Sequence, residues 1–188
     1  MGGVIGFIVV IIIAVVIIKK IAGALEDSKW KKQQEDEDRK RSEFERRAAE
    51  GDPDAIKKLI EMGTEIERVV MADGGFGDGL LNDAEKRTFE IIQNVIIKHG
   101  GMSDFKPTAA APLDIRYYQV SKKWFESSKG DRIWLTFSVA PMEGSPPTSA
   151  IKFYLLLKLP PEIIPAIAKE AEQGIKDYLI SKGLPLRT

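Results

Sequence analysis

Residues 132–140 read RIWLTFSVA, with an apolar side chain at every second position. Residues 150–158, AIKFYLLLK, repeat this alternation. Successive side chains of a strand point to opposite faces of its sheet, so the alternation predicts two strands with one buried face each. The buried faces are expected to carry Ile133, Leu135, Phe137 and Val139 in the first strand, and Ile151, Phe153, Leu155 and Leu157 in the second.

A third strand is predicted just upstream, at residues 113–121. Turn-forming residues separate the three strands: SSKGD lies at 127–131, and prolines and a glycine lie within 141–149. Connections as short as these join neighbouring antiparallel strands. The three strands are therefore expected to form an antiparallel meander.

One helix is predicted before the meander in the sequence, and one after it. Residues 81–99 have apolar side chains at helical spacing and stop at a pair of glycines, as helices tend to do. Residues 161–182 begin at the second of two consecutive prolines, and their apolar stripe ends before Gly183. A three-stranded antiparallel meander flanked by helices defines an α+β domain over residues 81–188.

Residues 52–80 are predicted to hold a helical segment and a glycine-rich loop. The apolar residues of this segment recur at helical spacing as far as Val70. Gly63 interrupts the pattern, and Thr64 and Glu67 match the capping box of a helix start. Two short helices are therefore expected before the loop.

The glycine-rich loop resembles an EF-hand calcium loop in part. In the window 74–85, Asp78, Gly79 and Glu85 fall at the fifth, sixth and twelfth positions of such a loop. Glycine and phenylalanine occupy its first and third positions, which leaves too few oxygen ligands for calcium. We therefore expect a glycine turn, followed by a helix that Asn82 caps.

Residues 26–51 are predicted to form a charged helical stalk or linker. Acidic residues precede basic ones by four positions along this stretch, an order that stabilises an isolated helix by about 0.2–0.5 kcal/mol per pair. The stretch has no apolar stripe, so a solvated strut is expected, with a partly disordered linker as the alternative.

Residues 4–18, VIGFIVVIIIAVVII, contain no polar side chain, and the next two residues are lysines. A bilayer core needs about 17–25 helical residues, so residues 1–25 are predicted to be a single transmembrane anchor. The basic residues follow the run, which predicts an N-terminus outside and a C-terminal domain in the cytoplasm. The residues expected to anchor or pack this helix are Gly2, Gly6, Lys19, Lys20 and Trp30.

The outward face of the meander is richer in aromatic residues than solubility requires. It is expected to carry Tyr118, Trp134 and Tyr154, which are candidate partner-docking residues. Two covers are compatible with such a face: the protein's own helices at 56–70, which we favour, or a partner. Basic neighbours of the aromatic residues suit single-stranded nucleic acid as well, but the zero net charge argues against a nucleic-acid partner.

The sequence offers no catalytic constellation. It contains no cysteine and a single histidine, His99, and it lacks the nucleophile-elbow, zinc-protease, phosphate-loop and dinucleotide motifs. No enzyme activity, cofactor or metal is therefore predicted, and His99 is expected to be structural or solvated.

These features together predict a non-enzymatic, single-pass membrane-anchored accessory or scaffold subunit that docks onto a larger membrane protein complex. The expected partners are the lipid bilayer and other membrane protein subunits, with homo-oligomers as a further option. Two alternatives stay open. One is a membrane-tethered ligand-binding or sensor domain that uses the meander face or the glycine loop, and the other is a pilin-like filament subunit.

Overall fold

The computed structural model describes residues 32, 35–77, 79–108, 113, 118–142 and 145–187. None of the helices within these residues is long and apolar enough to cross a membrane, so the structure does not support the transmembrane helix of the sequence prediction. Residues 1–25, on which that prediction rests, lie outside the described residues. The same holds for the candidate residues Gly2, Gly6, Lys19, Lys20 and Trp30.

The chain divides into two compact units, Met1–Ile56 and Lys57–Thr188. In the first unit, residues 35–49 are helical. Ion pairs one turn apart lie on the surface of this helix, for example Arg46–Glu50 at 2.7 Å. Because both side chains are largely solvent-exposed, such a pair contributes little to stability.

Asp52 caps the start of α2 (Pro53–Met62). Its Oδ1 accepts the backbone N–H of Asp54 at 2.9 Å, as the N-cap residue of a helix does. Arg47 donates two hydrogen bonds to Oδ2 of the same carboxylate, at 2.9 and 2.6 Å. The hydrogen bonds from Arg47 and from the backbone N–H of Ala55 lower the pKa of Asp52.

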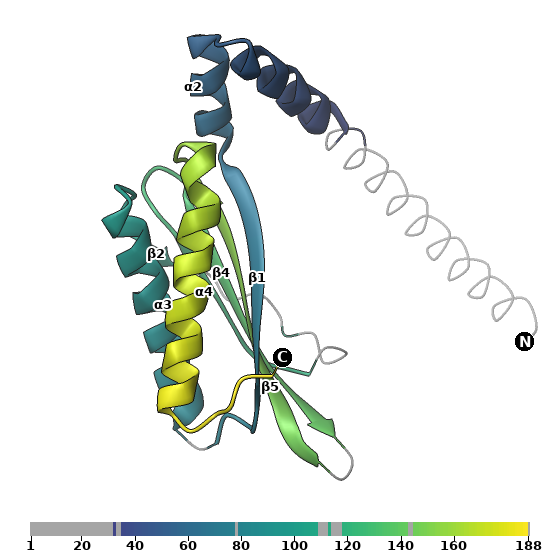
Figure 1. Cartoon of the computed structure of the whole chain (residues 1–188), viewed down its shortest axis with the longest axis vertical. Coiled ribbons are helices and arrows are strands. Elements are labelled where there is room, and N and C mark those ends of the chain that lie inside the picture. Colours follow the sequence, from purple (N-terminus) through teal and green to yellow (C-terminus); the bar gives the residue numbers. More distant parts are fainter. Residues whose placement is uncertain are drawn as a thin grey trace, which may run out of the picture. The chain divides into compact units, whose positions relative to one another are not determined.

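The second unit is built on a five-stranded antiparallel sheet in the order β1-β5-β4-β3-β2. The strands are β1 (Thr64–Asp73), β2 (Lys106–Pro107), β3 (Gln119–Glu126), β4 (Arg132–Met142) and β5 (Ser145–Leu157). The helices are α3 (Leu80–Lys98) and α4 (Ile164–Ser181), with the short 3-10 helix η2 (Pro161–Ile163) leading into α4. Both α3 and α4 lie on the same side of the sheet (Figure 1).

The core lies between the sheet and these two helices. Alternate residues of β4 and β5 are fully buried there, namely Ile133, Leu135, Phe137, Ile151, Phe153, Leu155 and Leu157. The helices contribute the buried side chains Ile92, Ile96, Ile164, Ile167 and Ile175. The predicted alternation of these two strands and the two covering helices are thus confirmed, except that Val139 is only half-buried.

The predicted three-stranded meander is wrong, because the sheet has five strands. Residues 64–73 form β1, where helical spacing and a capping box predict a helix. The same residues also alternate: Val70 is buried against the core, whereas Val69 and Met71 are exposed. Pairing along the whole of β1 with β5 selects the period of two. Gly63, with φ +79°, connects α2 to β1 in a left-handed conformation that suits glycine.

Two further boundaries differ from the sequence prediction. The third predicted strand, at 113–121, is β3 at Gln119–Glu126, so it includes residues that were assigned to a connection. The two-residue strand β2 lies between the predicted helix at 81–99 and the predicted strand at 113–121, where no strand is predicted, and it pairs with the end of β3. The predicted cap of α3 is also wrong: the helix begins at Leu80 after Gly79, so Asn82 already lies within its first turn.

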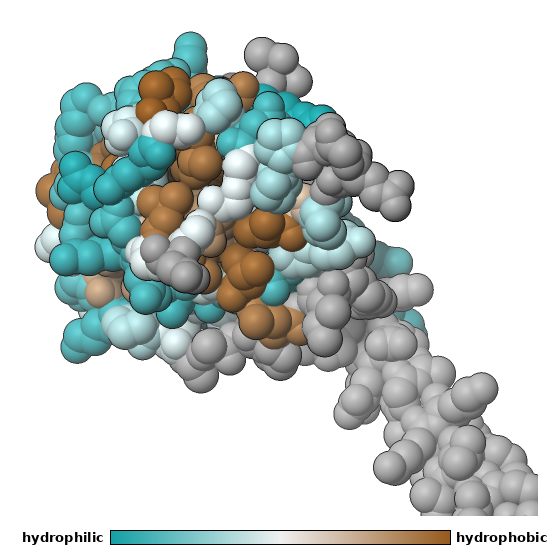
Figure 2. All heavy atoms as spheres, turned by 90° about the horizontal axis from the view of Figure 1, so that it is seen from below, coloured by the Kyte–Doolittle hydropathy of each residue, from teal (hydrophilic) through white to brown (hydrophobic). Residues whose placement is uncertain are grey.

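The C-terminal residues close one end of the core. Leu184 is buried, and Leu186 packs against the core and bridges to Ala72 of β1. Figure 2 views the molecule from below and shows a band of hydrophobic surface with hydrophilic residues around it. A segment predicted only to end a helix therefore also packs against the core and forms one bridge to β1.

Candidate docking face

The sheet face opposite α3 and α4, here called the open face, carries a row of aromatic residues. Directly opposed residues of an antiparallel ladder point to the same face. Trp124 of β3 is opposite Trp134 of β4, which is opposite Tyr154 of β5, which is opposite Glu67 of β1. The register therefore aligns three aromatic side chains and one carboxylate across four strands.

The rings of this aromatic row touch one another at steep angles. The centroids of Trp134 and Tyr154 lie 4.4 Å apart with an interplanar angle of 52°. Trp124 meets Trp134 edge to face, at 6.3 Å and 82°. Such geometry stabilises aromatic pairs by about 0.5–1.5 kcal/mol beyond their burial, so the row is held in place by its own contacts.

The neighbouring row is basic. Lys122, Thr136, Lys152 and Val69 are direct partners across the same four strands. The ammonium of Lys122 lies 5.5 Å from the ring centroid of Trp124, within the range of a cation–π contact. Lys152 forms an ion pair with Glu67 at 2.8 Å, in which both side chains are about half exposed.

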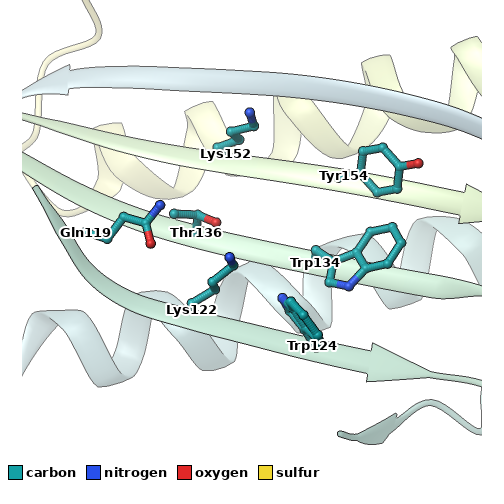
Figure 3. Close-up of a pocket in the computed structure, with 7 residues that line it drawn as sticks. All are labelled: Gln119, Lys122, Trp124, Trp134, Thr136, Lys152 and Tyr154. Carbon is teal, nitrogen blue, oxygen red and sulfur yellow. The ribbon is translucent and has the colours of Figure 1, made fainter. Parts of the chain in front are cut away.

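A hollow of about 360 Å³ lies over the two rows (Figure 3). Its lining comes from β3, β4 and β5 alone: Gln119, Lys122, Trp124, Trp134, Thr136, Lys152 and Tyr154. The indole Nε1 of Trp124 is buried and has no hydrogen-bond partner. An unpaired buried donor costs free energy, and this one has no exposed surface through which a ligand in the hollow could contact it.

The structure brings together two of the three predicted docking residues. Trp134 and Tyr154 contact each other on the open face. Tyr118 does not line the hollow; it lies just before β3 with φ +51°, is 55 % exposed, and accepts the N–H of Val139 through its carbonyl. The prediction that helices at 56–70 cover this face is wrong for residues 64–70, because these residues form part of β1 in the sheet itself.

Two residues of the hollow, Lys122 and Trp124, were not predicted from the sequence. They lie in residues that the sequence assigns to a connection between strands. Lys122 and Trp124 alternate with Ser121, Lys123 and Phe125, whose ring centroid lies 3.9 Å from that of Phe89 on α3, but the charged Lys123 obscures this pattern in the sequence. That alternation is short and lies beside a turn, so it competes with a loop assignment.

The outer edge of β1 is a poorer candidate for docking than the open face. The carbonyl of Met71 accepts the N–H of Arg187 at 3.0 Å, and the N–H of Asp73 donates to the carbonyl of Pro185 at 2.9 Å. Farther along, the guanidinium of Arg68 donates to the carbonyl of Glu67 at 2.8 Å. Occupied backbone groups and charged side chains protect an edge against strand addition.

Two clusters of ionisable side chains outside the open face connect α3 to α4. His99 Nε2 lies 3.0 Å from Glu170, which also pairs with Lys98 at 2.6 Å, and these contacts connect α3 to α4. At the other end of the two helices, the Tyr178 hydroxyl donates to Asp83 at 2.9 Å. Within the described residues, no group of three or more histidine, cysteine, aspartate or glutamate side chains is placed to hold a metal ion.

Comparison of the chain with known protein families, with curated proteins and with solved structures finds no match.

Proposed function

We propose that this protein is a non-enzymatic accessory or scaffold subunit, tethered at a membrane, that docks onto a larger membrane protein complex through its open face. The single observation that carries the proposal is the aromatic row, Trp124, Trp134 and Tyr154, on the face opposite the helices. Tryptophan and tyrosine at the centre of a face contribute strongly to protein–protein binding free energy.

Apolar side chains around the row support a macromolecular partner. Val69 and Met71, at the β1 end of the open face, are 46 % and 44 % exposed, and Val120 of β3 is 40 % exposed. Single exposed apolar residues are ordinary, but Val69 lies in the row next to the aromatic row, where it is opposite Lys152. A partner that covers the face would remove these side chains and the aromatic row from water together.

The membrane location in this proposal rests on the sequence alone. Residues 4–18 have no polar side chain, and Lys19 and Lys20 follow them. An apolar run of this length next to basic residues is typical of attachment to a membrane. The proposed orientation, with the folded domain on the cytoplasmic side, follows from the same lysines.

Co-purification of the full chain from its native cells in mild detergent tests the proposal. We expect stoichiometric partner subunits, identified by mass spectrometry, to be lost from the Trp134→Ser/Tyr154→Ser double variant. Ile180→Ser on α4, which is also an exposed apolar position, is the matched control and should keep them. An unchanged set of partners in a folded double variant would contradict docking through the open face.

A second candidate is a membrane-tethered sensor that binds a small ligand, and the hollow is the observation that favours it. Its volume of about 360 Å³ falls within the usual range of roughly 300–1,000 Å³ for ligand sites. Such a protein would purify alone and gain melting temperature with its ligand. An accessory subunit would instead purify with partners, so the two functions separate in the same preparation.

A further inference from the structure

We propose that the hollow binds an extended, acidic segment of the partner protein, whose acidic end faces Lys122 and whose apolar side chains pack against Trp134 and Trp124. This inference rests on the proposed function and specifies the chemistry of the docked segment.

The charge of the lining is the first argument. Lys122 and Lys152 line the hollow, and no carboxylate does. In the part of the chain that the structure describes, Lys122 contacts the Trp124 ring but has no ion pair. Lys152 and Lys122 lie on β5 and β3 with one strand between them, so their backbones are about 10 Å apart. Because Lys152 is already paired with Glu67 at 2.8 Å, Lys122 is the lysine that a carboxylate of the ligand would contact.

The shape of the surface is the second argument. A second hollow, also about 360 Å³, is lined in part by Thr108, Arg132 and Glu126. Trp124 and Trp134 line both hollows, so the pair forms a ridge between them. Lys122 and Glu126 are four residues apart on β3, about 13 Å along the strand. A chain of roughly four or five extended residues would cross the ridge and reach both hollows.

The ring angles favour a peptide over single-stranded nucleic acid. Bases stack on aromatic faces that lie open and parallel to them. In Figure 3 the rings of Trp124, Trp134 and Tyr154 are instead turned against one another, and their interplanar angles of 82° and 52° leave wedge-shaped spaces. Such spaces suit proline or branched aliphatic side chains, as in aromatic-lined peptide grooves.

The distribution of charge over the whole open face supports the same choice. Glu67 and Glu126 share this face with the lysines, and Glu126 pairs with Arg132 at 3.1 Å. A polyanion lying across the face would meet these carboxylates. A short peptide with its acidic residues at Lys122 avoids both, because Glu67 is paired with Lys152 and Glu126 lies four residues away along β3.

The test is a selection from a phage-displayed library of random twelve-residue peptides, with the full chain in detergent as bait. We expect the enriched peptides to be rich in aspartate and glutamate, with proline or leucine between them. Fluorescence anisotropy of the most enriched peptide should show affinity at least about tenfold lower for Lys122→Glu, because a charge-assisted contact becomes repulsive. Lys169→Glu, an exposed lysine on α4, is the matched control and should bind as the wild type does.

Failure of this inference is separable from failure of the proposed function. Neutral or basic enriched peptides, no enrichment, or a fifteen-residue oligothymidylate that binds as tightly as the best peptide would each overturn it. If Lys122→Glu keeps the native partners while Trp134→Ser/Tyr154→Ser loses them, docking through the open face stands and the acidic segment is excluded. If neither variant loses them, the proposed function itself fails.

Discussion

The two faces of the sheet differ in how the same strands are used. On the face toward α3 and α4, alternate residues of β4 and β5 are large, aliphatic or phenylalanine, and fully buried. On the open face, the residues between them are tryptophan, tyrosine, threonine, lysine and one leucine, and they are half-buried or exposed. Each strand thus supports a core on one side and an amphipathic surface on the other.

The contrast between the two faces predicts that different residues determine stability and binding. Burial of an aliphatic side chain away from water is the main favourable term in folding. Tryptophan, tyrosine and lysine on the open face keep polar atoms that can contact a partner, and the domain keeps its core without them. We therefore expect substitutions on the helix-covered face to change the free energy of unfolding, and substitutions on the open face to change binding.

The largest expected effect on stability is from Phe153→Ala. Phe153 is fully buried in the middle of β5, so truncation leaves a cavity and should lower the free energy of unfolding by about 3–5 kcal/mol. Tyr154→Ser, the adjacent residue on the other face, should cost much less. Chemical denaturation of both full-chain variants in detergent measures the difference, and equal losses would contradict the division between the faces.

A smaller effect is expected at the glycine that precedes β1. Gly63→Ala places a Cβ in a left-handed conformation, at a cost of about 1–2 kcal/mol, and 3.0 Å from Leu156 Cδ1. Gly183→Ala has a similar φ of +75° but meets no atom within 4 Å, so it isolates the conformational part. We expect a lower melting temperature for Gly63→Ala than for Gly183→Ala. The reverse order would contradict close packing of Gly63 against the open-face end of β5.

The ion pairs between the covering helices predict a modest pH dependence of stability. Hydrogen bonds from Lys182 and then Tyr178 lower the pKa of Asp83 below its ordinary value of 3.8. A lowered carboxyl pKa stabilises the fold above that value, and the contribution is lost as pH falls below it. Asp83→Asn should therefore destabilise the protein at neutral pH, with a difference from the wild type that shrinks below pH 3.8. Thermal melts across the acidic range measure this difference, and one independent of pH would contradict the assignment.

The smallest effect on stability is expected for Lys122→Glu, the open-face variant designed to weaken binding. Lys122 is half-buried, and loss of its cation–π contact with Trp124 should lower the free energy of unfolding by only about 0.5–1 kcal/mol. Lys169→Glu on α4 should show a similarly small change. Urea titrations of both variants check this expectation. A large loss of unfolding free energy for Lys122→Glu alone would mean that Lys122 stabilises the fold, and would contradict a role in binding only.

The helix-covered half of the domain was predictable from local pattern. In β4 and β5 every second residue is apolar over a full strand length, and α3 and α4 have long stripes bounded by glycine and proline. β1 was not predictable, because residues 64–73 satisfy both helical and strand spacing and only the distant partner β5 decides between them. β2 has two residues and no local signal at all.

The candidate site was predictable only in part. Trp134 and Tyr154 follow from the alternation of strands that the sequence identifies. Their alignment with Trp124 depends on the register between β3 and β4, which is a property of pairing rather than of any one segment. Tyr118 was misplaced because the start of β3 lies one residue beyond it, where the chain has not yet entered the ladder.

The most direct test of docking through the open face is site-specific photo-cross-linking in native cells. The photoreactive residue p-benzoylphenylalanine would replace Trp134 in one full-chain variant and Ile180, an exposed residue of α4, in another. Docking through the open face predicts a discrete adduct with a partner protein from position 134 and none from position 180. No adduct from position 134 in a folded variant, or the same adduct from both positions, would contradict it.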